Sequence, residues 1–164
     1  MRAVLLAGAV AALVSFGAAR AQAPEDAKFA SAADVAAVIA KAKAAAKPGA
    51  ANTIESIFAV SPYATSLEFH QGMGQASVHE NQAELIIVAE GKGVANLGGQ
   101  LVDPKRTNAH NLTAKTISGA TSRPVAKGDM WFVPQGVPHQ LNAAEGGISV
   151  ITLHVQRPVP AEAP

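Results

Sequence analysis

GDMWFVPQGVPHQLN, residues 128–142, is the stretch of sequence that decides the fold. A Gly-Asp turn leads into the apolar run 130–133, which predicts a buried strand. The Pro-Gln-Gly sequence at 134–136 turns the chain back. His139 then begins a returning strand, with its imidazole available to the interior of the protein. A neutral imidazole in that place is a good ligand for a divalent transition metal.

A second stretch, GMGQASVHENQAELIIVAEG at residues 72–91, carries His79 and Glu84. An apolar run follows Glu84, so we expect this carboxylate in an apolar interior. Burial there disfavours its charged form unless a metal or a protonated histidine stabilises it. Glu84 is therefore a candidate metal ligand, a candidate general base, or a buried partner of His79. Strand alternation places Glu80 and Glu90 in solvent.

The rest of the chain after residue 49 alternates short β-type runs with Gly, Pro and Asn turns. Such spacing is typical of a sandwich or a closed barrel. The polar stretch 103–113 is expected to be an insertion loop, and without an internal repeat we expect one barrel. The predicted strands are residues 53–60, 64–70, 76–78, 85–90, 93–97, 114–117, 130–133, 139–141 and 148–156.

The first 21 residues have the order of a secretory leader. Positive Met1-Arg2 precedes an apolar run to Ala18, and Ala19-Arg20-Ala21 is a small-x-small cleavage site. The alternative, a membrane anchor, needs a longer apolar run and a basic flank. We therefore expect cleavage after residue 21 and a periplasmic or secreted product, with no membrane association afterwards.

Residues 22–50 are expected to form a helical extension. Ser31 with Asp34 three residues later is typical of a helix start, and Pro48-Gly49 ends the helix, which runs to about Ala46. The helix is expected to pack on the outside of the domain or on a partner subunit. The alternative is a solvated alanine-rich linker, since isolated helices are marginal in water.

Composition excludes several classes of protein. The 164 residues contain no cysteine, which excludes disulfides, thiolate metal sites and a cysteine nucleophile. The formal net charge is +1, and removal of the leader would take away Arg2 and Arg20. We find no basic stripe of the kind that nucleic acid requires, so no nucleic-acid partner is expected.

The two quoted stretches resemble the two sequence motifs of the cupin superfamily, and the runs 98–103 and 116–119 resemble those of a subgroup of small bacterial cupins. The second motif is Gly, five residues, Pro-x-Gly, two residues and His, and residues 128–139 match it. The first is His-x-His, three or four residues, Glu, six residues and Gly. Glu84 and Gly91 fit its second half, and His79 then occupies the second histidine position, with Ser77 in the first. In the other register, His79 is the first histidine and Asn81 stands in place of the second.

The resemblance implies an all-β fold, a single jelly-roll cupin β-barrel over residues 51–158. The N-terminal helix lies outside the resemblance, and residues 159–164 are expected to be a C-terminal tail. The resemblance also implies a metal site of His79, Glu84 and His139, one histidine short of the family's three histidines and one glutamate. Fe, Mn, Zn, Ni and Cu are all compatible with such ligands. Candidates to line the substrate pocket are Ser77, His70 and Trp131.

Two histidines are expected outside the site: His154 at the rim or an interface, and His110 in solvent. The sequence leaves two functions open. One is a metal-dependent enzyme of oxygenase, isomerase or lyase type that acts on a small organic molecule. The other is a non-catalytic ligand-binding or sensing cupin that has lost its metal. Covering exposed strand edges favours a homodimer.

Overall fold

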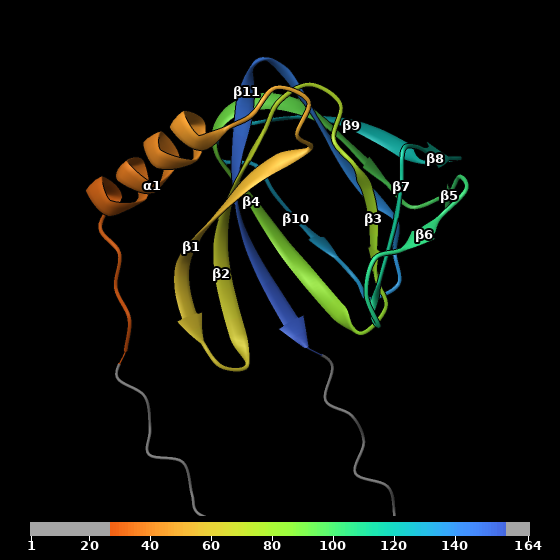
Figure 1. Ribbon diagram of the computed structural model, residues 1–164, viewed down its shortest axis with the longest axis horizontal. Helices are drawn as coiled ribbons and strands as arrows, with labels where there is room; N and C mark the ends of the chain where they lie inside the picture. Colours follow the sequence, from red (N-terminus) through yellow and green to blue (C-terminus); the bar gives the residue numbers. More distant parts are fainter. Residues whose placement is uncertain (1–26, 157–164) are drawn as a thin grey trace, which may run out of the picture.

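In the computed structural model, which describes residues 27–156, one helix precedes a series of antiparallel strands (Figure 1). The elements in chain order are α1 (Ala32–Ala45), β1 (Asn52–Val60), β2 (Tyr63–His70), β3 (Ala76–His79), β4 (Gln82–Leu97), β5 (Gln100–Leu101), β6 (Lys105–Arg106), β7 (Asn111–Ala114), β8 (Ile117–Ser118), β9 (Thr121–Ala126), β10 (Met130–Val133) and β11 (His139–Gln156). The predicted leader and the C-terminal tail lie outside the described residues.

The strands build one jelly roll (Figure 1). Its nine-stranded sheet follows the order β1-β2-β11-β3-β7-β6, and β4 joins β11 to β9 and β10. The sheet is not closed into a full ring of paired strands, because β1 and β6 are its ends. The predicted all-β jelly roll with an N-terminal helix is confirmed.

Two strands are much longer than the sequence predicted. The runs 85–90 and 93–97 both belong to β4, and 139–141 and 148–156 both belong to β11. Glycines that suggest turns in the sequence lie instead within these paired strands. The register of β11 against β4 shifts between Ala143 and Ile148. Gly91 has a φ of 86°, and a Cβ there would collide with the backbone of Gly147. Glycine permits this close approach of the two strands.

The predicted insertion loop at 103–113 is not all loop. It contains β6 and the start of β7, which pair with each other. The Arg106 guanidinium also donates two hydrogen bonds to the Glu80 carboxylate beyond the end of β3. Cross-strand pairing thus creates short strands where the polar sequence has little strand propensity.

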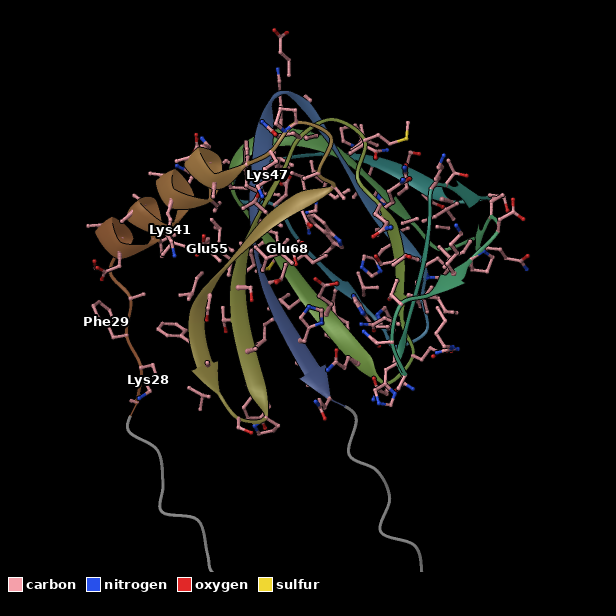
Figure 2. The ribbon with its side chains drawn as sticks, viewed as in Figure 1. Lys28, Phe29, Lys41, Lys47, Glu55 and Glu68 are labelled. Carbon is pink, nitrogen blue, oxygen red and sulfur yellow. The ribbon has the colours of Figure 1, made fainter. Side chains whose placement is uncertain are left out.

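Helix α1 begins as the sequence predicts. The Asp34 backbone N–H donates to Ser31 Oγ at 3.2 Å, and the Ser31 N–H donates to Asp34 Oδ2 at 2.8 Å, which makes a capping box. One ion pair ties the helix to β1: Lys41 Nζ lies 2.6 Å from Glu55 Oε2 (Figure 2). The N-terminal extension is therefore a capped helix attached to the sheet.

The helix covers the outer face of β2. Ile39 and Ala42 of α1 form one buried apolar cluster with Leu67 and Phe69 of β2. This packing excludes a solvated linker. Because side chains alternate along a strand, the residues that alternate with Leu67 and Phe69 face the interior. Glu68 is one of them, and it lines the interior cavity.

A second apolar cluster fills the other part of the jelly roll, and its buried members are Ile86, Val88, Ala95, Val125, Val133, Leu141, Ile148 and Val150. Three of these residues, Ile86, Leu141 and Val150, also border the interior cavity. The cluster therefore forms the apolar part of the cavity wall. Within residues 27–156, no helix is long and apolar enough to cross a membrane.

Candidate metal centre

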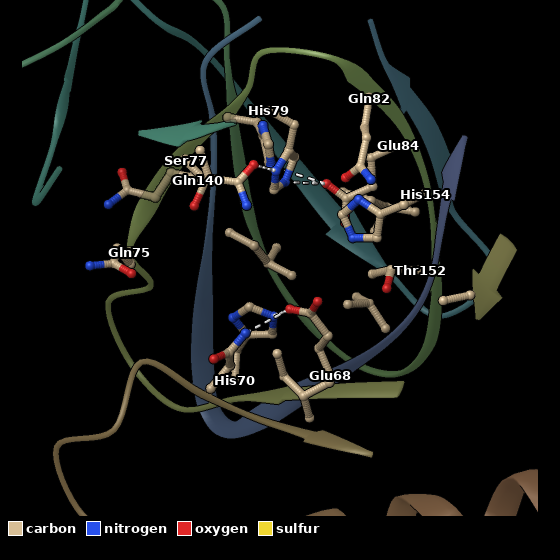
Figure 3. A pocket seen from close by; sticks show the side chains of 18 of the residues that line it. Glu68, His70, Gln75, Ser77, His79, Gln82, Glu84, Gln140, Thr152 and His154 are labelled. Carbon is tan, nitrogen blue, oxygen red and sulfur yellow. Dashed lines mark hydrogen bonds and ion pairs between the residues drawn. The ribbon is translucent and has the colours of Figure 1, made fainter. Parts of the chain in front are cut away.

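The interior cavity has a volume of about 530 Å³ and opens between the strands of the jelly roll (Figure 3). Strands β1, β2, β3, β4, β7 and β11 all contribute side chains to its wall. This volume lies within the range of small-molecule pockets.

Three imidazoles surround one buried carboxylate in this cavity. His139 Nε2 lies 3.0 Å from Glu84 Oε2, and His79 Nε2 lies 3.5 Å from the same oxygen. His154 Nε2 lies 3.7 Å from Glu84 Oε1. Only 5 % of the Glu84 side chain is exposed, so these imidazoles are its main polar surroundings.

Strand register brings the four residues together. His154 of β11 is the direct cross-strand partner of Glu84 on β4. His139, at the other end of β11, pairs with Ser77 of β3, and His79 follows on the same face of β3. The centre is therefore assembled from both ends of β11 and from two further strands.

The donor atoms of three of the four residues are close enough to share one ion. Ligand atoms of His79, Glu84 and His154 all lie within 4.8 Å of one another. The ring centroids of His79 and His139 are 5.2 Å apart, and those of His79 and His154 are 4.8 Å apart. Imidazole nitrogen and carboxylate oxygen together suit divalent transition metals.

His154 differs from the sequence expectation. It was expected at the rim or an interface, and it lies instead beside Glu84 inside the cavity. Alternation on β11 places Val150, Thr152 and His154 on one face, but the sequence does not show which face is interior. The missing signal is the pairing register of β11 with β4, which only the folded sheet provides.

Among the predicted pocket residues, His70 and Ser77 line the cavity. Trp131 does not line it. This side chain packs against the interior apolar cluster from β10, so its role is in the core. Its strand neighbour Phe132 is 57 % exposed on the opposite face. His110 is exposed in the segment between β6 and β7, as expected.

Glu84 gives a direct test of whether the residues fit a metal. Its Oε2 atom is buried and accepts no well-directed hydrogen bond from the described residues, although His139 Nε2 is 3.0 Å away. A buried carboxylate oxygen without a hydrogen bond is costly. A cation held between this oxygen and the imidazoles would remove that cost, so the site fits a metal ion.

Electrostatics favour an ionised Glu84 and shift the pKa values of its histidine neighbours in opposite directions. Burial alone would raise the pKa of Glu84, but contacts with the imidazoles of His139 and His79 outweigh it and hold the pKa well below its usual range. For His79, burial acts to lower the pKa, and Glu84 together with Asn111 raises it overall. Burial lowers the pKa of His154, which favours the neutral form that binds metals.

The lowered pKa of Glu84 predicts an acid-dependent loss of stability in the metal-free protein. A group with a depressed folded-state pKa contributes stability above its unfolded pKa, about 4.3 for Glu, and loses it as the pH falls towards the folded value. The stability advantage of the wild type over Glu84→Gln should shrink by about 1.4 kcal/mol per pH unit below about pH 4. Urea unfolding with a chelator between about pH 6 and pH 3 measures this difference. A difference in the free energy of unfolding between wild type and Glu84→Gln that stays constant with pH would contradict the lowered pKa of Glu84.

Asn111 holds His79 in one orientation. His79 Nδ1 donates to Asn111 Oδ1 at 2.9 Å, which leaves Nε2 directed at Glu84. Hydrogen bonds of this kind set the tautomer and direction of a ligating histidine. Asn111 comes from β7, the cross-strand neighbour of β3 at this position.

Replacing Asn111 with alanine should weaken Co²⁺ binding by about 10- to 100-fold without unfolding the protein. The reason is that His79 would keep its place but lose its fixed tautomer. Competition with a chromophoric chelator measures the affinity. Asn108→Ala, in the same segment but outside the cavity lining, is the control and should bind Co²⁺ like the wild type.

Comparison with known proteins gives the family. The cupin family profile matches residues 45–160, well over half of the chain. No curated protein sequence matches this chain. The crystal structure of TT1209 from Thermus thermophilus is similar, with a TM-score of 0.50 and 16 % identity over 68 % of this chain and 89 % of that one. At this identity the likeness concerns the fold alone.

Two further solved structures have lower TM-scores. The cupin domain of Cnp3 from Schizosaccharomyces pombe has a TM-score of 0.48 and 13 % identity over 65 % of this chain. This chain spans 61 % of the length of that one. KdgF from Halomonas sp. has a TM-score of 0.49 and 17 % identity over 68 % of this chain and 82 % of its own. With the motif match, the jelly roll and the family profile in agreement, this chain belongs to the cupin family.

Proposed function

We propose that this cupin holds one divalent transition metal between His79, Glu84, His139 and His154 and acts on a small organic molecule bound in the cavity. The observation that carries the proposal is the buried Glu84 carboxylate, with three imidazoles around it and one oxygen without a hydrogen bond. His154 takes the place of the histidine that the first motif lacks at Ser77.

The protein's own residues have distinct parts in this proposal. The imidazoles of His79, His139 and His154 supply nitrogen donors, and Glu84 supplies the charge that offsets part of the metal's. Asn111 orients His79. A metal bound here would polarise an oxygen of the bound molecule. Imidazole and carboxylate donors suit Fe, Mn, Ni, Cu and Zn, so the donor set leaves the choice of metal to experiment.

A second candidate function is a non-catalytic small-ligand binder without metal. One observation favours it: the imidazoles already lower the pKa of Glu84, and Glu84 in turn raises that of His79. An ionised Glu84 and a protonated His79 would stabilise each other's charge without any metal ion. In that case the cavity would bind its ligand through the same polar side chains, with no turnover.

Metal content separates the two functions. The chain, purified without a histidine tag, is compared by elemental analysis with His79→Ala and His139→Ala. His110→Ala is the matched control, because His110 is exposed outside the cavity lining. We expect near-stoichiometric metal in the wild type and the control, and loss in the two cavity variants. No metal after reconstitution with Fe, Mn, Ni, Cu or Zn would overturn the metal proposal and leave the ligand-binding function.

Export and homodimer formation belong to the same proposal. The order of charge, apolar run and small residues in 1–21 supports export to the periplasm or medium. Within residues 27–156, one edge of β1 pairs with no other strand, which supports dimer formation. The mass of the protein recovered from a periplasmic fraction tests cleavage after residue 21. Light scattering on the same sample tests the dimer.

A further inference from the structure

A second polar cluster lies in the same cavity as the metal centre. Asn52 Nδ2 donates to Glu68 Oε2 at 2.7 Å, and His70 Nε2 lies 3.1 Å from the same oxygen. The side chains of Glu68 and His70 are only 16 % and 11 % exposed. None of the three belongs to the metal centre, and all three line the cavity.

The two clusters occupy opposite ends of the cavity. On β2, Glu68 pairs with Val150 of β11, whereas Ala64 pairs with His154. Four residues of strand therefore separate Glu68 from the level of His154, about 13 Å between backbone positions. Figure 3 shows the Glu68–His70 pair facing the His79, Glu84 and His154 group across the open space. A molecule bound at the metal would extend towards Glu68.

Glu68 has one oxygen available to such a molecule. Both hydrogen bonds that reach the carboxylate end on Oε2. Oε1 accepts none from the described residues and is not among the buried unpartnered atoms, so it is open to the cavity. A carboxylate oxygen in this state accepts hydrogen bonds from a hydroxyl group and repels a second anion.

The remaining cavity wall carries no compensating positive charge. Among the described residues, none of those lining the cavity is a lysine or an arginine. The wall instead offers neutral hydrogen-bonding groups, and its carboxamide side chains are Asn52, Gln75, Gln82, Asn111, Gln140 and Gln156. Carboxamides both donate to and accept from hydroxyl groups. With an open Glu68 oxygen and no lysine or arginine among the described lining residues, the end of the cavity near Glu68 is suited to hydroxyl groups and unsuited to a carboxylate or phosphate.

We infer that Glu68, His70 and Asn52 form a distal binding site that selects a hydroxyl-bearing end of a small molecule and rejects an anionic one. The other end of that molecule carries the oxygen donor that meets the metal. This inference rests on the metal centre proposed above. The ligand class is a small hydroxy compound with at most one anionic end, so dicarboxylates and compounds with a phosphate at the distal end are excluded.

Matched pairs of probes test the inference. Succinate, glutarate and adipate are each compared with the hydroxy acid in which one carboxylate is replaced by a CH₂OH group. Binding to the Co²⁺-loaded protein is measured by calorimetry at about pH 8, where an ordinary imidazole is neutral. The visible spectrum of Co²⁺ reports whether the carboxylate end reaches the metal.

We expect the wild type to prefer the hydroxy acid of the best-fitting length by about tenfold or more, because the dicarboxylate places a second charge beside Glu68. In Glu68→Gln this preference should fall to within about twofold, chiefly because the dicarboxylate binds more tightly. Glu90→Gln is the control. It removes the same charge from an exposed position that faces Lys43, and it should keep the wild-type preference.

The outcomes separate the two proposals. A protein that binds no Co²⁺ overturns the metal centre and, with it, this inference. A protein that binds Co²⁺ but prefers the dicarboxylates overturns the distal site alone. So does an unchanged preference in folded Glu68→Gln. If Glu68→Gln does not fold, the wild-type preference between the paired probes still decides the question.

Discussion

Replacing His154 with alanine should lower the affinity for Co²⁺ by about 100-fold or more, because the loss of a direct ligand exceeds the 10- to 100-fold cost of losing a supporting hydrogen bond. His154 is the cross-strand partner of Glu84, and its lowered pKa keeps the imidazole neutral and ready to bind. Competition with a chromophoric chelator measures the affinity. The d–d spectrum of Co²⁺ reports the change in ligand number.

A rescue experiment makes this prediction specific. Ser77 occupies the position where the first cupin motif has a histidine, and it lines the cavity opposite His139. Ser77→His in the His154→Ala background should restore most of the lost affinity, because it returns a third imidazole to the centre from β3. The matched control is Thr65→His in the same background, on β2 but outside the cavity lining, and it should restore nothing. Wild-type affinity in His154→Ala would show that His154 is not a ligand.

Replacing Leu67 with alanine should destabilise the protein by about 2–5 kcal/mol, the usual cost of emptying a fully buried leucine site. Leu67 is 0 % exposed and packs with Ile39 and Ala42 of α1. Because β2 presents Leu67 to the helix and Glu68 to the cavity, this packing also determines which face of β2 is interior. Urea unfolding monitored by circular dichroism measures the change in the free energy of unfolding.

Val102→Ala is the control for this substitution. Val102 is 42 % exposed, so its truncation should change stability by no more than about 0.5 kcal/mol. A similar small loss for Leu67→Ala would mean that α1 does not cover β2 in solution. The solvated-linker alternative for the N-terminal extension would then be correct.

Much of the fold could be predicted from local patterns. The turn residues around the run 130–133 and the position of His139 indicate a strand–turn–strand unit without reference to the rest of the chain. The Ser31–Asp34 pair likewise predicts the helix start that the capping box confirms. These features depend on neighbouring residues, so the sequence contains them directly.

Strand lengths could not be predicted in this way. Gly91 suggests a turn by composition, yet it lies inside β4 because β11 approaches it closely at Gly147. The short strand β6 exists because β7 pairs with it. Pairing between distant segments overrides local propensity in both places.

The sequence by itself indicated a cupin and predicted a site of His79, Glu84 and His139, since the motifs place these residues at short, regular spacings. Only the tertiary structure brought His154 beside Glu84 and placed Glu68 and His70 across the cavity from them (Figure 3). The physical reason is that a strand presents alternate residues to opposite faces. Which face is interior depends on the helix packed against β2 and on the register of β11 with β4, and both are long-range contacts.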